Sequence, residues 1–248
     1  MRTHSDAAEP LRQGSVIRGT IFYVALALSA VIWALISLPL FLLPLRRRYW
    51  WITRWCVIVD WLVRVIGGIR VQVEGLENRP DTHGVVLANH QSAWETLNMV
   101  FHFYPQSWVL KRGLLKIPVF GWVLAHLEPI AIDRRDPRAA LRQVLEQGKE
   151  RLASGRWVVV FPEGTRVLPG QRERYQQGGA LLACRAGVPV TPVAHNAGEH
   201  WPRNGVRMRP GTIYVRIGPP IDTVGRTPAS VTQEAQDWID AHRQDLLR

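Results

Sequence analysis

The sequence predicts an α/β fold with a mostly parallel sheet flanked by helices, preceded by an N-terminal two-helix membrane motif. Three observations support this prediction. Beyond residue 68, short apolar segments alternate with amphipathic helical segments, a pattern typical of a parallel sheet covered on both faces. Residues 19–45 contain no charged side chain. The chain has 248 residues and is 47% hydrophobic, which is ample for a core.

The N-terminal region begins with a stretch of 18 residues that is polar overall and includes three arginines. The uncharged segment 19–45 would make a helix about 40 Å long, compared with a hydrocarbon core of about 30 Å. This length argues against a buried helix of a soluble protein. The early Ala-x-Ala at Ala25 and Ala27 leaves too short an apolar region for a cleaved signal peptide. We therefore expect a polar tail over residues 1–18 and a membrane helix after it.

A second apolar segment, residues 49–69, follows three consecutive arginines at 46–48 and carries three charged side chains of its own. Those charges make a full span costly, so this helix should lie in the interface or shield its charges against protein. Two arrangements stay open: one spanning helix followed by an interfacial one, or a helical hairpin that dips into one leaflet. Both assign residues 19–68 to membrane anchoring. The arginine cluster then places the rest in the cytoplasm, at the inner (cytoplasmic) membrane.

Composition narrows the partners without selecting one. Five of the eleven tryptophans lie between residues 33 and 61, as expected near a membrane–water interface. The net charge of +11 favours an anionic partner, which could be nucleic acid, lipid headgroups or an acidic carrier protein. The only two cysteines, Cys56 and Cys184, fit neither a metal site nor a disulfide framework, and favour a reducing compartment.

Residues 69–248 carry the α/β pattern and are expected to form one domain. Apolar residues at helical spacing predict helices over 138–153 and 231–246. Seven short apolar runs are strand candidates: 70–73, 84–88, 107–110, 130–132, 157–161, 190–193 and 212–217.

Residues 89–95, Asn-His-Gln-Ser-Ala-Trp-Glu, follow the strand candidate that ends at residue 88. His90 is a candidate general base, and Glu95 is a candidate for the carboxylate that orients it. Positions i and i+5 lie about 140° apart on a helix, so His90 should precede the helix, with Glu95 in its first turn. The structural alternative is a capping box formed by Ser92 and Glu95. His90 is harder to explain structurally, because nothing about folding requires imidazole at an apolar strand end.

Residues 161–166, Phe-Pro-Glu-Gly-Thr-Arg, emerge from another predicted strand. Loops at the carboxyl ends of parallel strands are where open α/β folds place ligands. Gly164 lets the backbone approach an anion closely, and Arg166 offers a planar fork for phosphate or carboxylate. The alternative is an ordinary turn with a solvated arginine.

Further cations follow other strand candidates, with Lys111 after one and Arg134 after another. Each could be a solvated loop charge. Four strand ends, at residues 88, 110, 132 and 161, lead into His, Lys, Arg or the segment Glu-Gly-Thr-Arg. Because the ends of parallel strands can converge, the sequence predicts a base beside several phosphate-binding cations.

Taken in order, these segments resemble the motifs of the glycerolipid acyltransferases, specifically the 1-acylglycerol-3-phosphate (lysophosphatidic acid) acyltransferases. The match covers roughly residues 70–220. The resemblance implies a glycerolipid acyltransferase-like fold and the N-terminal two-helix membrane motif. It implies acyl transfer from an acyl-CoA or acyl-ACP thioester to the sn-2 hydroxyl of 1-acyl-glycerol-3-phosphate, giving phosphatidic acid. The matching blocks are residues 89–95, Lys111 with 117–121, 131–134, 161–166 and 188–193.

The resemblance also implies roles for individual residues. His90 would remove the hydroxyl proton while Glu95 fixes the imidazole, and backbone N–H groups near the following helix would receive the oxyanion. No metal is expected, and no cofactor beyond the acyl-CoA or acyl-ACP co-substrate. Arg166, Arg134 and Lys111 would hold the acceptor phosphate. The expected substrate-binding set is Lys111, Arg134, Glu163, Gly164, Thr165 and Arg166.

One position departs from the family pattern, because Glu95 stands where an aspartate is usual. The role of the carboxylate should survive the longer side chain, but a different lysolipid acceptor stays open, as does a CoA-independent transacylase. A non-catalytic membrane-associated anion binder is the alternative from another class. No nucleic-acid motif is present, so the expected partners are a lysophospholipid, acyl-CoA or acyl carrier protein, and the membrane.

Overall fold

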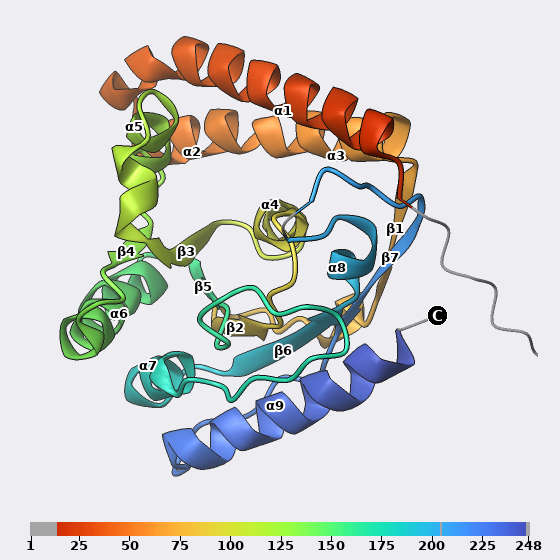
Figure 1. Ribbon diagram of the computed structural model, residues 1–248. Helices are drawn as coiled ribbons and strands as arrows, with labels where there is room; N and C mark the ends of the chain where they lie inside the picture. Colours follow the sequence, from red (N-terminus) through yellow and green to blue (C-terminus); the bar gives the residue numbers. More distant parts are fainter. Residues whose placement is uncertain (1–13, 204, 247–248) are drawn as a thin grey trace, which may run out of the picture.

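The computed structural model describes residues 14–203 and 205–246. Within these residues a seven-stranded sheet has helices on both faces, and the N-terminal helices lie along one side of it (Figure 1). The strand order is β1-β7-β6-β2-β5-β3-β4. Every neighbouring pair is parallel except β6 and β7. The prediction of a mostly parallel sheet flanked by helices is confirmed.

All seven predicted strands are present, with ends that differ from the predictions by at most two residues. The central strands β2 and β5 are buried along their whole length, which explains their continuous apolar sequence. The strands are β1 Ile69–Glu74, β2 Val85–Ala88, β3 Gln106–Lys111, β4 Ile130–Ile132, β5 Trp157–Val160, β6 Val190–His195 and β7 Gly211–Ile217.

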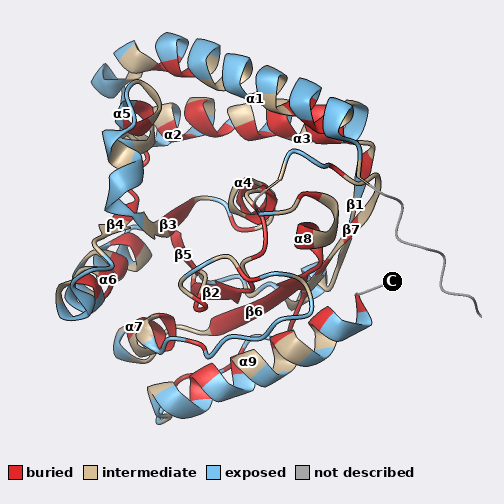
Figure 2. Ribbon diagram, in the orientation of Figure 1, coloured by how far each residue is buried: buried red, intermediate tan, exposed pale blue. Residues whose placement is uncertain are grey.

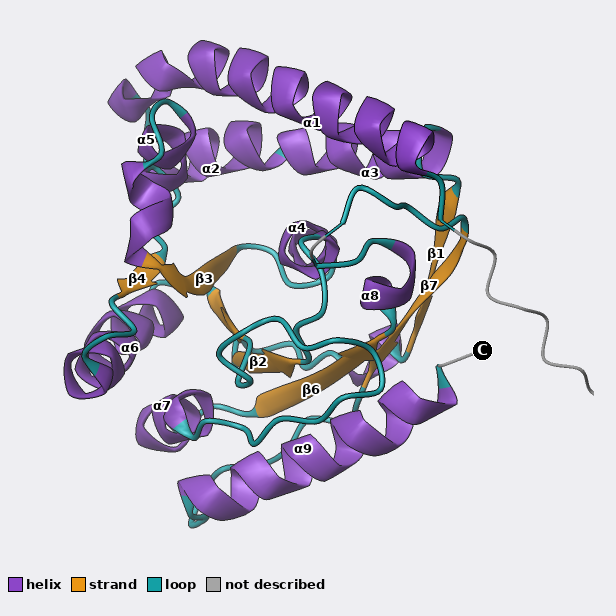
Figure 3. Ribbon diagram, in the orientation of Figure 1, coloured by secondary structure: helices purple, strands orange, loops and turns teal. Residues whose placement is uncertain are grey.

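Three helices cover one face of the sheet: α6 Pro137–Ala153, α7 Gly178–Ala186 and α9 Pro228–Asp245 (Figure 3). The predicted helices α6 and α9 both begin with a side-chain cap followed by proline, a strong start signal. The other face carries α4 Trp94–Asn98 and α8 Ala197–His200. The remaining short elements are η2 Leu76–Asn78, η3 Met99–Phe101, η4 Arg112–Lys116 and α5 Phe120–Ala125.

The N-terminal region contains α1 Val16–Ser37, η1 Leu38–Leu42, α2 Leu45–Thr53 and α3 Trp55–Val65. The second predicted apolar helix is therefore divided at Arg54. Among the described residues, one segment, Val16–Leu42, is long and apolar enough to cross a membrane. A second membrane helix is not confirmed. The predicted polar tail lies mostly outside the described residues, and its last residues already belong to α1.

The first half of α1 is packed onto the α/β domain. The ring centroids of Phe22 and of Trp201, at the end of α8, lie 4.8 Å apart. The Trp201 indole donates a 2.8 Å hydrogen bond to the Tyr23 hydroxyl, and Arg18 donates to the Gly67 carbonyl. The opposite face of α1 is exposed along its length (Figure 2). Helix α1 thus lies along the domain and presents an apolar face to the outside.

Two apolar clusters form the core, one on each face of the sheet. The first joins the sheet to the N-terminal helices, and the second joins it to α6, α7 and α9. The strands β2, β5, β3 and β4 are consecutive parallel neighbours. Their carboxyl ends consequently share one edge of the sheet, where the sequence predicted a convergence of polar residues.

Candidate active site

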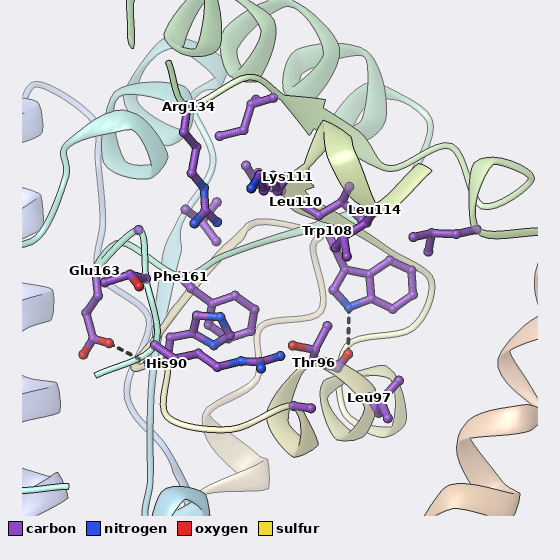
Figure 4. Close-up of a pocket in the computed structure, with 18 of the residues that line it drawn as sticks. His90, Thr96, Leu97, Trp108, Leu110, Lys111, Leu114, Arg134, Phe161 and Glu163 are labelled. Atoms are coloured by element: carbon purple, nitrogen blue, oxygen red, sulfur yellow. Dashed lines mark hydrogen bonds between the residues drawn. The ribbon is translucent and has the colours of Figure 1, made fainter. Parts of the chain in front are cut away.

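His90 and Glu95 contact each other directly. His90 lies in the connection after β2, and Glu95 lies in the first turn of α4. The His90 Nδ1 atom is 2.7 Å from Glu95 Oε1. The imidazole stacks on the ring of Phe161, with centroids 4.3 Å apart and planes inclined by 17° (Figure 4). The geometry is that of a base held by a carboxylate, and its catalytic role stays a prediction.

The Glu95 carboxylate also organises the turn between β2 and α4. Its Oε1 atom accepts 2.8 Å hydrogen bonds from the backbone N–H groups of Gln91 and Ser92. The Ser92 hydroxyl accepts from the N–H of Trp94, instead of from that of Glu95. Only the glutamate half of the predicted capping box is therefore formed. One carboxylate both caps the helix and bonds His90, so the two interpretations of Glu95 coexist.

The electrostatics of Glu95 favour a charged carboxylate. Its burial raises the pKa, but hydrogen bonds from the His90 side chain and the Ser92 N–H act against this effect, and the pKa lies below its ordinary value. An ionised Glu95 accepts a hydrogen bond from the Nδ1–H group of His90. The other ring nitrogen, Nε2, is then unprotonated and able to act as a base.

The same hydrogen bonds alter one expectation about the oxyanion. The N–H groups of Gln91, Ser92 and Trp94, at the start of α4, already donate to side chains. These three groups are not available to a developing oxyanion. The cause is local, because the side chains of Glu95 and Ser92 fold back over this turn.

Glu163 holds the main chain of His90 from the opposite side. Its Oε2 atom accepts a 3.0 Å hydrogen bond from the His90 N–H, and its Oε1 atom lies 3.5 Å from Arg243 Nη1 on α9. The N–H of Val167, in the same loop, donates to the His90 carbonyl at 2.7 Å. The loop after β5 thus brackets both peptide groups of His90. The Glu163 side chain is 1% exposed and bonds the His90 main chain through Oε2, which supports the loop-shaping role more than a direct substrate contact.

The other predicted residues of this loop differ in exposure. Gly164 has φ +69°, a left-handed conformation that favours glycine, and nothing lies within 4 Å of the position of a Cβ atom. Thr165 is exposed, and Arg166 is partly buried. All three line the cavity described next.

A cavity of about 1170 Å³ opens beside His90. The predicted cations Lys111, Arg134 and Arg166 all line it, although they come from three different strand ends. In Figure 4 the Arg134 side chain extends toward Phe161 and His90. The structure therefore brings together the histidine and the three cations that the sequence placed at converging strand ends.

Neighbouring cations do not all share this position. Arg135 pairs with Asp133 at 2.7 Å and has a side chain that is 90% exposed. It is absent from the cavity lining, whereas Arg134 belongs to it. Arg174, in the loop before α7, also lines the cavity and was not predicted, because no strand end or motif marks it.

The rest of the cavity wall is largely apolar, in two groups. One group comes from the N-terminal helices and α5, and the other from α6 and α7. A space of this size with an apolar wall and few polar groups can hold long hydrocarbon chains. The first group includes Leu26, Trp33, Trp55, Phe120 and Val123, and the second includes Ala140, Leu141, Val144 and Leu181.

Two further positions near His90 were missed by sequence reasoning. His195 is fully buried at the end of β6 and bonds Asn89, the residue before His90. Arg243 is buried on α9, four residues after Ile239. Its spacing along the buried stripe of that helix is a signal that could have identified it, whereas nothing in the sequence distinguishes His195.

The described residues contain no group of three or more His, Cys, Asp and Glu side chains arranged to hold a metal ion.

Comparison with known proteins identifies acyltransferases as relatives of this chain. Residues 70–196 match the protein-family model described as Acyltransferase. The chain is 48% identical over 228 residues to the 1-acyl-sn-glycerol-3-phosphate acyltransferase of Pseudomonas aeruginosa, covering 90% of this chain and 89% of that protein. It is 34% identical over 185 residues to the 1-acyl-sn-glycerol-3-phosphate acyltransferase alpha of Mus musculus, covering 73% of this chain and 63% of that one.

Among solved structures, the fold is similar to the crystal structure of the 1-acyl-sn-glycerophosphate acyltransferase PlsC of Thermotoga maritima. The TM-score is 0.78 at 24% sequence identity, and the match covers 94% of this chain and 96% of that chain.

Proposed function

Since the chain belongs to the 1-acyl-sn-glycerol-3-phosphate acyltransferase family, we propose that it acylates the sn-2 hydroxyl of 1-acyl-glycerol-3-phosphate from a thioester, giving phosphatidic acid. The observation that carries the proposal is the 2.7 Å contact between His90 Nδ1 and Glu95 Oε1. His90 lies at the wall of a largely apolar cavity that is also lined by three cations. A base, anion-binding groups and room for acyl chains are the parts that this reaction needs.

His90 acts as the general base in this proposal. The acceptor hydroxyl oxygen attacks the thioester carbonyl carbon while His90 Nε2 takes the hydroxyl proton. The carbon–sulfur bond then breaks, and the same proton passes to the departing sulfur. Glu95, ionised and bonded to Nδ1, holds the reactive tautomer and stabilises the imidazolium. General-base catalysis of this kind accounts for about 10²–10⁴ in rate.

Cations around the cavity bind the acceptor phosphate. Arg134 and Arg166 offer planar guanidinium groups suited to phosphate oxygens, and Lys111 adds a point charge. All three line the cavity that contains His90. Binding the phosphate there sets the distance between the headgroup and the sn-2 hydroxyl, which brings that hydroxyl to His90.

The acyl donor is a thioester of coenzyme A or of acyl carrier protein. Either carrier is anionic and fits a chain with a net charge of +11. The apolar walls of the cavity accommodate the hydrocarbon chains. No residue of the chain is required to form an acyl-enzyme in this reaction, because the hydroxyl attacks the thioester directly.

The exposed face of α1 contacts the membrane, with the helix lying in the plane of one leaflet. Large apolar side chains such as Leu28, Val31 and Leu35 are exposed on α1, while Phe22 on its other face is buried against the domain. A helix fixed to the domain along its first half is better suited to lie in the interface than to cross the bilayer. With the arginines at 46–48, this favours the inner (cytoplasmic) membrane, with the catalytic domain in the cytoplasm.

A donor-by-acceptor matrix tests the proposed function. Purified protein in mixed micelles is given acyl-CoA or acyl carrier protein thioesters with lysophosphatidic acid, a neutral lysolipid or a lyso-amino-lipid. The highest kcat/KM is expected with lysophosphatidic acid. Preference for another acceptor would assign the enzyme to a different lysolipid, as the unusual Glu95 allows. Salt-dependent nucleic-acid binding without thioester turnover would instead indicate the non-catalytic anion binder.

A further inference from the structure

A buried charge cluster lies directly behind His90. Glu163 and Arg243 have side chains that are 1% and 4% exposed, with Glu163 Oε1 and Arg243 Nη1 3.5 Å apart. Arg243 Nη2 also lies 3.0 Å from Asp240 Oδ1, one turn earlier on α9. Helix α9 lies outside the segment 70–196 that matches the Acyltransferase family model. The proposed acyl transfer uses none of the α9 side chains.

We propose that Arg243 is a positioning residue for acyl transfer, which acts by keeping Glu163 as a charged acceptor for the main-chain N–H of His90. The inference rests on the proposed function, since it concerns the geometry of the same base. It extends the catalytic machinery from the four strand ends to the C-terminal helix.

The hydrogen bonds show how the effect reaches His90. Glu163 Oε2 accepts from the His90 N–H at 3.0 Å, and the Val167 N–H donates to the His90 carbonyl at 2.7 Å. A charged acceptor makes a stronger bond to an N–H than a neutral one. Protonation of Glu163 would weaken the hydrogen bond from the His90 N–H, which is one of the two bonds that hold the His90 backbone. The new carboxyl hydroxyl would also be a donor that requires an acceptor. The imidazole would then lose its alignment between Glu95 and the acceptor.

The charge state of Glu163 is closely balanced. Burial raises its pKa to about 7, and the carboxylates of Glu95 and Asp240 act in the same direction. The hydrogen bond from the His90 N–H and the charge of Arg243 act against this rise. Removing the positive charge would therefore raise the pKa of Glu163 further, and the carboxyl would be protonated at neutral pH.

The surroundings of Glu163 offer no substitute for Arg243. The other groups that face it are Glu95 from α4, Asp240 from α9 and Tyr175 from the loop before α7. The two carboxylates are negative. Burial raises the pKa of Tyr175 well above its ordinary value, so this phenol stays neutral. Arg243 is the cation paired with Glu163 among the described residues.

A purely structural role makes a different prediction. If Arg243 only packs α9 onto the sheet, its loss should lower the melting temperature and reduce activity equally at every pH. The proposed role requires a shift in the pH–rate profile, and it requires that the shift depend on Glu163. These consequences separate the two explanations.

The experiment compares Arg243→Met and Arg243→Lys in the full-length protein, each with wild-type Glu163 and with Glu163→Gln. Arg243→Met should move the acidic limb of the pH–rate profile up by about one pH unit, as loss of one opposing charge implies, and this shift lowers kcat at pH 7 about fivefold. KM for lysophosphatidic acid should change less than about twofold, since phosphate binding is untouched. Arg243→Lys, which keeps the charge, should restore the position of the limb.

With Glu163→Gln in place, adding Arg243→Met should cause little further loss, because a neutral amide needs no counterion. Arg156→Met is the matched control, since this buried arginine pairs with Glu128 at 3.2 Å, away from His90. It should affect stability without moving the limb. If Arg243→Met does not fold, Arg243→Gln takes its place with the same expectations.

The proposal is overturned if the acidic limb stays in place, or if Arg243→Met causes the same loss with glutamine at position 163. Failure of the proposed function is separate, because it would appear as absent acyl transfer in the wild type. Each variant is compared with a wild type that turns over, so the positioning role is judged only where the reaction itself is established.

Discussion

Asn89 and His195 bond each other through both side chains and both main chains. The Asn89 amide donates to the His195 carbonyl at 2.9 Å and accepts from the His195 N–H at 3.0 Å. The His195 imidazole lies 2.7 Å from the Asn89 carbonyl, and burial lowers its pKa, so the ring is neutral and donates through Nε2. The ends of β2 and β6 are thereby joined at the residue before His90.

Asn89→Ala should therefore destabilise the protein markedly. The substitution removes two buried hydrogen bonds and leaves two main-chain groups of His195 without partners, which costs about 2–4 kcal/mol. Chemical denaturation in detergent micelles would measure this loss. The conservative Asn89→Asp retains only the acceptor oxygen, so its stability should fall between those of the wild type and Asn89→Ala. A change below about 0.5 kcal/mol for alanine would show that the pair contributes little, since that is the size of ordinary surface effects.

Glu95→Gln should separate helix capping from catalysis. The glutamine oxygen can still accept hydrogen bonds from the N–H groups of Gln91 and Ser92, but a neutral amide cannot balance the charge of an imidazolium. We expect kcat to fall by about 10²-fold or more. The melting temperature should fall only modestly.

Glu95→Asp gives the complementary comparison, because it keeps the charge and shortens the reach. Activity partly retained in the aspartate variant and lost in the glutamine variant is the expected pattern. Full activity and stability in Glu95→Gln would leave Glu95 with a capping role alone.

Arg134→Gln should weaken acceptor binding, because Arg134 lines the cavity beside His90. Loss of a charge-assisted contact to phosphate costs about 1.5–3 kcal/mol, which corresponds to a 10-fold to 150-fold increase in KM for lysophosphatidic acid. Arg135→Gln is the matched control, since Arg135 is exposed and paired with Asp133. Equal kinetics for the two variants would remove Arg134 from the phosphate site.

Charges placed on the outer face of α1 should weaken membrane binding. Leu28 and Val31 are 59% and 53% exposed on that face. The double variant Leu28→Glu with Val31→Glu should shift the protein from sedimented vesicles to the supernatant, because each charge must leave the apolar region. Gln244→Glu is a control that adds a negative charge at an exposed position of α9, away from this face. Unchanged vesicle binding of the α1 variant would place the membrane contact on another surface.

The strands were predictable because each combines a short apolar run with a clear boundary. The division of the second N-terminal helix at Arg54 was not predictable, because no proline or glycine marks it. Within the site, the order of the strand ends in the sheet decides which cations meet. Sequence spacing could propose that Lys111, Arg134 and Arg166 converge on His90, but only the topology brings them to one cavity.

The residues that support His90 were less accessible to sequence reasoning. Glu163 was recognised from its motif, yet its contacts with the His90 N–H and with Arg243 depend on tertiary packing. Arg243 lies 80 residues further along the chain and His195 lies 32 residues further. Their partners are set by which helix and strand pack beside the loop, and local pattern carries no such information.

The most direct test of the account is the rate of acyl transfer to lysophosphatidic acid by His90→Ala, measured on purified protein with confirmed folding. The central claim is that His90 is the general base, and its loss should reduce kcat by about 10²–10⁴. The melting temperature should stay close to that of the wild type, because the His90 side chain lies at the cavity wall. Activity within a few-fold of the wild type would contradict the claim.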